Sequence, residues 1–375
     1  MLMQLTYRYR LYPSRGQEEK LLAALEFCRW LYNRLLEEMN RAKAEDKKIT
    51  QLKTQALIVK LKEEKPELKT VYSKVLQMVN HQLWNNISAL AGLKRNGRRV
   101  GRLRFKGEDR LKALNYNQSG FKVEGKKLVL SKVGEVPIKL HREIKGKVKG
   151  VIVKREGSGR WYAMFQVENE TEPLPKTRKA VGIDVGIKHF LTDSEGQQVE
   201  NPRFYERTLE RIRIRHKQLS RKQEGSENHE KAKAKLLKIY EKLVNRRDDF
   251  LHKLSRFYVN NYDVIAVENL NIAAMARNHN LAQYILDTSW GKFLHFLSYK
   301  AEGAGRRLVE VDPKGTSQEY KNREIDRDYN AALNILKRGL VGRGWPEPTP
   351  VEMEPLRELI EVSASSVVEA GSPLR

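Results

Sequence analysis

The N-terminal third of the chain combines one alternating segment with long helical patterns. Residues 3–12 place apolar or aromatic side chains at every second position, which is typical of a half-buried strand, and Pro13-Ser14 ends it. From Gln17 to Ala44, apolar residues recur every three or four positions and predict an amphipathic helix. A second helical pattern covers 70–93. Cys28 lies on the apolar stripe of the first helix, so we expect it to pack in the core.

The middle of the chain has the residue pattern of β-strands. Residues 111–170 consist of short alternating segments separated by turns, with a Gly-Ser-Gly hairpin loop at 157–159. We expect a small β-barrel or sheet here that also takes in the N-terminal strand. The following segment, 171–179, contains two prolines and predicts a linker and domain boundary.

Buried strands and helices alternate beyond the linker. Residues 179–201 predict a hairpin of buried strands, and further apolar strands are expected at 262–270 and 306–313. Helical patterns occupy 203–223, 227–260, 279–304 and 328–340. This alternation predicts an α/β domain, and residues 341–375 read as a mostly flexible tail.

The charge of the chain points to a polyanionic partner. Its 375 residues include 72 Lys and Arg against 47 Asp and Glu, a formal net charge of +25. Nucleic acid is the first partner to consider. No apolar run approaches the roughly 18 residues of a membrane-spanning helix, and the N-terminus lacks the features of a signal peptide. We therefore expect a cytoplasmic protein.

Three carboxylates occupy positions that local structure alone explains poorly. Asp184 interrupts an apolar strand, Glu268 ends another, and Asp328 opens the final helix. Each has an ordinary alternative, namely a strand-end charge or, for Asp328, a helix N-cap, and Asp326 is an alternative ligand. Together they form the carboxylate constellation of RNase H-like nucleases. Hard oxygen ligands suit Mg²⁺ or Mn²⁺, and two such ions roughly 3.5–4 Å apart can drive phosphodiester hydrolysis. Asp193 and Asp263 instead read as surface or cap residues.

Ordered motifs along the chain resemble the TnpB (OrfB) family, the transposon-encoded relatives of type V CRISPR effectors. The stretches that carry the resemblance are YRYRLYPSRGQEEKLLAALEFCRWLYN, GIDVGIKHF, IAVENLN, VDPKGTSQ and DRDYNAALNILKRG. The resemblance implies an RNA-guided DNA endonuclease whose catalytic and metal-binding residues are Asp184, Glu268 and Asp328. It further implies a guide RNA encoded near the transposon end, double-stranded target DNA beside a short flanking motif, and a monomer that binds one RNA. The resemblance also implies a prokaryotic protein associated with the nucleoid.

The resemblance also implies a domain layout that agrees with the texture of the sequence. A wedge domain of β-barrel type takes 1–15 and 98–172, with a helical recognition domain, 16–97, inserted in it. A RuvC-like nuclease domain follows at 178–340, and the tail is 341–375.

The chain departs from the family in one place. Members usually carry a four-cysteine zinc ribbon where this chain has only residues 319–325, and its single cysteine lies elsewhere. We therefore expect the ribbon to be absent, no zinc to bind, and cleavage to be slower, with the metal ligands intact.

Candidate nucleic-acid contacts lie in two places within the first half. A glycine-spaced basic stretch can follow a phosphate backbone through Arg95, Arg98, Arg99, Arg102 and Arg104. One face of the second helix could read base edges of the flanking motif through Lys74, Gln77 and Asn80 or His81, although a solvated polar face explains it equally well. The helices at 203–260 could line a heteroduplex channel or form an exposed salt-bridged pair, and their candidate residues are Arg211, Arg213, Arg246, Arg247 and Lys253.

Three functions fit these features. The first is a guided, metal-dependent DNA endonuclease. The second is an RNA-guided DNA-binding protein with weak or no cleavage, which the missing ribbon favours. The third is an unguided nuclease or strand-transfer enzyme on the same fold.

Overall fold

The computed structural model describes residues 2–316, 326–341 and 354–355. The chain forms two compact units, one of Gln4–Glu168 and a second that combines the first three residues with the chain from Asn169 onward. The predicted linker is bonded to the second unit: the Leu174 amide donates to the Ala304 carbonyl at 3.0 Å, and Arg306 donates to the Pro175 carbonyl at 2.8 Å.

The first unit contains three long helices, α1 (Arg15–Ala44), α2 (Gln51–Glu64) and α3 (Ser73–Arg95), with a 3₁₀ turn, η1 (Pro66–Thr70), before the last. Ser14 and Gln17 form a reciprocal capping box that starts α1. Cys28 is fully buried on α1, as predicted, and burial raises the pKa of its thiol to about 12. The sequence patterns missed α2, which buries only Thr54, Ile58 and Leu61.

The seven-stranded sheet of this unit has the order β2-β6-β7-β1-β5-β4-β3 and is barrel-like and nearly closed. Its strands are β1 (Leu2–Leu11), β2 (Ala113–Asn117), β3 (Phe121–Glu124), β4 (Lys127–Leu130), β5 (Gly134–Lys139), β6 (Lys147–Arg155) and β7 (Trp161–Glu170), with a short turn, η2 (Gln118–Gly120), after β2. The N-terminal strand therefore lies in the middle of the predicted sheet. Helices and sheet share one hydrophobic core, so the predicted recognition and wedge regions pack as a single body.

The second unit is built on a six-stranded sheet of order β12-β11-β8-β9-β10-β13. Its strands are β8 (Ala180–Val185), β9 (His189–Asp193), β10 (Gln197–Glu200), β11 (Val264–Glu268), β12 (Arg307–Val311) and β13 (Glu354–Pro355). The strands β8, β9 and β10 run antiparallel, whereas β11 and β12 continue the sheet parallel to β8. This arrangement is the RNase H-like one, so the predicted RuvC-type fold is confirmed. Of the predicted tail, β13 pairs with β10, and most of the rest lies outside the described residues.

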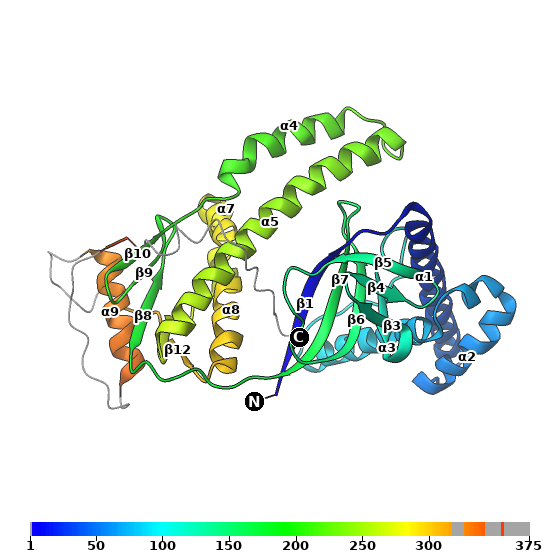
Figure 1. Cartoon of the computed structure of the whole chain (residues 1–375), viewed down its shortest axis with the longest axis horizontal. Coiled ribbons are helices and arrows are strands. Elements are labelled where there is room, and N and C mark those ends of the chain that lie inside the picture. The colour runs from blue at the N-terminus through cyan, green and yellow to red at the C-terminus, as the bar shows by residue number, and fades with distance from the viewer. Residues whose placement is uncertain (1, 317–325, 342–353, 356–375) are drawn as a thin grey trace. The chain divides into compact units, whose positions relative to one another are not determined.

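The helices of this unit are α4 (Leu209–Ser220), preceded by η3 (Glu206–Thr208), α5 (Glu227–Asn261), α6 (Ile272–Met275), α7 (His279–Thr288), α8 (Trp290–Gly303) and α9 (Arg327–Leu340). Within this unit, β8 lies between α9 on one side and α5 and α8 on the other (Figure 1). The helix predicted over 279–304 is two helices, because Ser289 adopts a left-handed conformation with φ of 57°. None of the helices in the described part of the chain is long and apolar enough to cross a bilayer.

Candidate active site

Asp184 and Glu268 stand at the carboxyl ends of two neighbouring parallel strands. In the register of β8 and β11, Ile183 pairs with Val267. The next residues along the two strands are Asp184 and Glu268, and neighbouring strands of a sheet lie about 4.8 Å apart. Ligand sites of open α/β sheets form at these carboxyl ends.

Both residues lie on the face of the sheet that α9 covers, and glycines let α9 approach that face closely. A Cβ at Gly182 would lie 2.2 Å from the Ala332 carbonyl oxygen of α9, so the helix backbone approaches β8 more closely than any larger residue allows. On β11, Ala266 meets Gly339 of α9 in the same way. Residues two apart in a strand share a face, so Asp184 lies on the α9 side with Gly182, and Glu268 lies there with Ala266.

The first turn of α9 supplies the third carboxylate. Asp326 is the N-cap: its Oδ1 accepts hydrogen bonds from the backbone N–H of Asp328 at 2.9 Å and of Tyr329 at 3.2 Å. The capping role that the sequence left open for Asp328 therefore belongs to Asp326. The Asp328 side chain instead reaches the loop after β8, where its Oδ2 lies 3.9 Å from the position of a Cβ on Gly186.

The surroundings of Asp184 strongly raise the pKa of its carboxyl group. Burial, followed by repulsion from Glu268 and Asp328, raises its pKa from 3.8 to about 8. Among the described residues, neither Asp184 nor Asp328 has a hydrogen-bond or ion-pair partner for its carboxylate. The same residues hold no ready-made cluster of three or more His, Cys, Asp or Glu that could chelate a metal. The three carboxylates thus influence one another without being drawn together.

The donor set nevertheless fits a hard divalent cation. Three carboxylates supply only oxygen ligands, which Mg²⁺ and Mn²⁺ prefer. Two of the carboxylates have no competing protein partner among residues 2–316 and 326–341, and a cation would relieve the repulsion that raises the pKa of Asp184.

A positioning link that the sequence analysis missed holds Glu268. The Thr316 hydroxyl donates a short hydrogen bond to Glu268 Oε1, and the Thr316 carbonyl accepts one from Asn334 Nδ2 of α9 at 2.7 Å. Both Thr316 and Asn334 are buried. The available signal was the GTSQ stretch, whose threonine connects β11 to α9.

Two other acids have structural roles. Of the two roles predicted for Asp193, surface or cap, the first is wrong and the second holds: it is fully buried, and its Oδ1 accepts the backbone N–H of Glu195 at 3.0 Å and of Gln197 at 2.9 Å in the turn after β9. Its Oδ2 accepts a hydrogen bond from the Tyr258 hydroxyl at 3.0 Å, and burial raises its pKa to about 6. Asp263 pairs with Arg306. Burial alone would raise the pKa of Asp263, but hydrogen bonds from the backbone of Thr177 and Arg178 outweigh it and lower the pKa.

Comparisons with known proteins agree with this geometry. A family model described as "Probable transposase" (OrfB) matches residues 164–279, and a Cas12f1-like TNB domain model matches 290–335. A Streptomyces pristinaespiralis protein described as "Putative RNA-guided DNA endonuclease" is 30% identical, with 96% of this chain and 94% of that protein covered. The chain belongs to the TnpB (OrfB) family. Another member, InsQ of Escherichia coli K12, described in the same words, is 27% identical, with 96% and 98% covered.

Two further matches are informative about structure. A family model named for a helix-turn-helix domain matches residues 1–48 of this TnpB-family chain, which here form β1 and α1. A solved Cas12f1-sgRNA-target DNA complex aligns with a TM-score of 0.48 and 13% identity, covering 86% of this chain and 83% of that one. This similarity is too low to assign site residues in this chain.

The basic stretch of this family member is exposed. The five arginines of the prediction are solvent-exposed and have no ion-pair partner within the part of the chain that is described: Arg95, Arg98, Arg99, Arg102 and Arg104. The stretch is anchored where it ends, because the Lys106 amide donates to Asn33 Oδ1 at 2.7 Å and the Lys106 carbonyl accepts from Arg29 at 3.0 Å. Held at one end, it presents its charge to solvent.

The predicted base-reading face of α3 is only partly available. Lys74 and Gln77 are half-buried. Asn80 is fully buried: its Oδ1 accepts from the Thr54 hydroxyl at 2.8 Å and its Nδ2 donates to the Gln51 carbonyl at 3.1 Å. Asn80 is therefore committed to α2, which corrects its placement as a DNA contact, and we retain Lys74 and Gln77.

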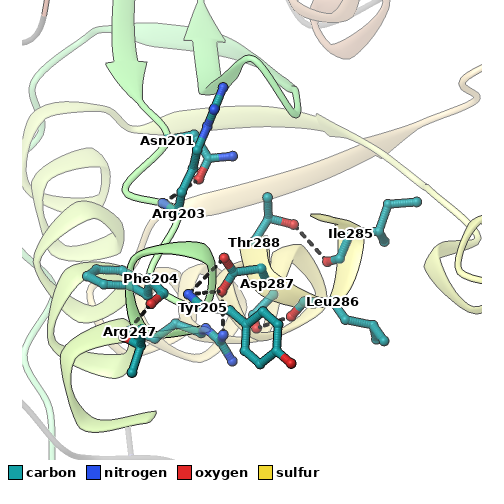
Figure 2. Close-up of polar contacts among 11 residues, drawn as sticks. Asn201, Arg203, Phe204, Tyr205, Arg247, Ile285, Leu286, Asp287 and Thr288 are labelled. Carbon is teal, nitrogen blue, oxygen red and sulfur yellow. Dashed lines mark hydrogen bonds and ion pairs between the residues drawn. The ribbon is translucent and has the colours of Figure 1, made fainter. Parts of the chain in front are cut away.

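The helix pair α4 and α5 contains both ion-paired and exposed cations, so both predictions for it, a salt-bridged pair and a nucleic-acid channel, apply in part. Arg247 forms an ion pair with Asp287 at 2.5 Å, and Lys253 forms one with Asp249 at 2.8 Å, so neither is a free cation. Figure 2 shows Asp287 at the end of α7, where its carboxylate also accepts the Tyr205 amide at 3.0 Å. The remaining predicted cations of the pair are exposed: Arg211, Arg213 and Arg246.

Proposed function

We propose that this protein is an RNA-guided DNA endonuclease that hydrolyses the phosphodiester bonds of target DNA with Asp184, Glu268 and Asp328. The observation that carries the proposal is that these residues lie at the carboxyl ends of the neighbouring strands β8 and β11 and in the first turn of α9, near enough for Glu268 and Asp328 to repel the charge of Asp184. Membership of a family whose relatives are described as RNA-guided DNA endonucleases supports guidance and DNA as the substrate.

The three carboxylates would hold Mg²⁺ or Mn²⁺, and a bound pair of such ions supplies an activated water and stabilises the leaving oxygen. The chain's own residues prepare the site. Thr316 holds Glu268 Oε1, which leaves the other carboxylate oxygen for a ligand. Asp326 caps α9 and so leaves Asp328 free to face β8. We expect no zinc, because the chain has one cysteine, Cys28, and it is buried in the first unit.

Nucleic acid would be held mainly through its backbone. The net charge of +25 and the exposed arginines at 95–104 suit phosphate contacts without sequence reading. Base pairing with a guide RNA, encoded near the transposon end, would then provide specificity, as in other guided nucleases. Lys74 and Gln77 are our candidates for reading the flanking motif. We propose that a monomer with one RNA is the working unit.

The test uses the full chain purified with its copurified RNA. That RNA is sequenced, and a plasmid carrying the matching target is offered with Mg²⁺. Asp184→Asn and Glu268→Gln keep side-chain shape and remove one charge each, so they should abolish cleavage and leave target binding unchanged. Glu310→Gln, on an exposed position of the neighbouring strand β12, is the matched control and should cut normally. Undiminished cutting by either site variant would refute the assignment.

The same experiment decides the second candidate, a guided DNA-binding protein with weak or no cleavage. The observation that favours it is the absence of cysteine from residues 319–325, where relatives of this family usually carry a zinc ribbon. Tight target binding with an uncut plasmid would support this alternative. We expect instead slow but measurable cleavage, because positioning of the strand affects rate more than it affects the metal ligands.

A further inference from the structure

The helices α4 and α5 form an arm that extends beyond the sheet of the second unit (Figure 1). The two helices bury apolar side chains, namely Ile212 of α4 and Leu236 and Leu243 of α5. The arm therefore has a small apolar core of its own. Residues 209–245 carry eleven Lys and Arg against five Asp and Glu. An exposed helical hairpin with this excess of positive charge is suited to a polyanion.

The base of the arm is fixed. Arg247 of α5 and the Tyr205 amide before α4 both bond to Asp287 at the end of α7, as Figure 2 shows. Lys292 of α8 adds an ion pair with Asp248 of α5 at 2.5 Å. These contacts hold α5 against the helices that pack on the sheet, so the far end of the arm is carried by a rigid support rather than by a loop.

A hollow of about 430 Å³ lies at that far end, beside the 221–226 turn. It is lined mainly by hydrogen-bond donors and cations: Gln218, Arg221, Lys222, Asn228, Lys231 and Lys235. Lys231 is paired with Glu227 at 2.7 Å. Within the described chain, Arg221, Lys222 and Lys235 have no ion-pair partner, so three positive charges face the hollow uncompensated.

The lining indicates what can bind. The only apolar side chain in it is that of Ala232, and no aromatic residue offers a surface on which a base could stack. The volume of about 430 Å³ lies within the roughly 300–1,000 Å³ of small-molecule pockets, so it leaves room for more than one phosphate group. We propose that this hollow binds consecutive phosphates of a nucleic-acid strand, without reading its bases. The inference rests on the proposed function only for the class of ligand, since guide RNA and target DNA share this backbone chemistry.

The test compares two triple variants of the full chain. The hollow variant is Arg221→Gln with Lys222→Gln and Lys235→Gln. The control variant removes three charges from exposed positions of the same arm that do not line the hollow: Lys217→Gln, Lys238→Gln and Lys242→Gln. Binding of an RNA of about 30 nucleotides and of a DNA of about 30 base pairs is measured by anisotropy over a series of salt concentrations.

We expect the hollow variant to lose about tenfold or more in affinity for the RNA, the DNA or both at moderate salt. The slope of log K against log salt should flatten by roughly 0.7–0.9 for each phosphate that the variant no longer neutralises. The control variant should lose at most about threefold, as expected from long-range charge alone. The probe that shows the loss identifies the source of the phosphates.

Equal losses in both variants, or no loss in either, would overturn the proposal, because the hollow would then add nothing to the general charge of the arm. The exposed substitutions should leave the melting temperature unchanged, and the single variant Lys235→Gln repeats the comparison if the triple variant melts lower. Binding is measured without divalent metal, so a protein that never cleaves DNA still passes or fails this test on its own.

Discussion

Removal of the Asp184 charge should stabilise the metal-free protein at neutral pH. The pKa of this carboxyl in the folded state is about 8, against 3.8 for an unperturbed group. When the pKa of a group is higher in the folded than in the unfolded state, the group contributes its full stabilising free energy at pH values below the unfolded pKa. This stabilisation is lost as the pH rises through the folded pKa. For Asp184 the loss therefore develops between about pH 4 and pH 8.

The size of the effect follows from these pKa values. From the unfolded pKa of 3.8 up to pH 7, an interval of about 3.2 pH units, the carboxyl is ionised in the unfolded chain but stays largely protonated in the folded one. At 1.36 kcal/mol per unit, this difference lowers the free energy of unfolding at pH 7 by about 4 kcal/mol at most. Asp184→Asn removes the charge and breaks no hydrogen bond of the described protein, since the carboxylate accepts none. The wild-type protein should then lose melting temperature between pH 5 and pH 8, by roughly 5–15 °C for a unit of this size.

The assay is calorimetric unfolding in EDTA at pH 5, 6, 7 and 8. The curve for Asp184→Asn should be nearly flat where the wild type falls, and Glu310→Gln, an exposed carboxylate outside the site, should follow the wild type. Addition of Mg²⁺ should remove the pH dependence of the wild type, with release of up to about one proton per chain at pH 7. Identical pH profiles for wild type and Asp184→Asn would refute the burial of Asp184 and its repulsion by Glu268 and Asp328.

Two further substitutions test how the site and the arm are positioned. Gly182→Ala should displace α9 from β8 and destabilise the second unit by about 1–3 kcal/mol, with cleavage lost before target binding, because its Cβ would overlap the Ala332 carbonyl. Gly16→Ala, at an exposed position of α1 with open space around it, is its control. Asp287→Asn should raise the rate of amide hydrogen exchange in the η3 segment and at the base of α5, because Arg247 loses its charge partner. The local free energy of opening should fall by about 1–3 kcal/mol. Glu37→Gln, in an exposed pair on α1, should show no such change, and equal exchange in the two variants would contradict the anchoring role.

The sequence by itself determined the features that depend on near neighbours. Alternation and helical periodicity located β1, α1, α5 and the buried strands β8 and β11. A charge within or at the end of an apolar strand is also a local signal, so Asp184 and Glu268 stand out from their neighbours in the sequence alone. Charge composition likewise pointed to a polyanion, because net charge needs no knowledge of the fold.

The tertiary structure decided what each exposed-looking polar group contacts. Asp326, rather than Asp328, caps α9, Asn80 is buried against α2, and Arg247 is paired with Asp287. Thr316 reaches Glu268 across 48 positions of sequence. Periodicity tells which residues share a face of a helix or strand, but not which other element covers that face. Burial, ion pairs and the perturbed pKa of Asp184 all depend on that second element, and for this reason only the folded chain reveals them.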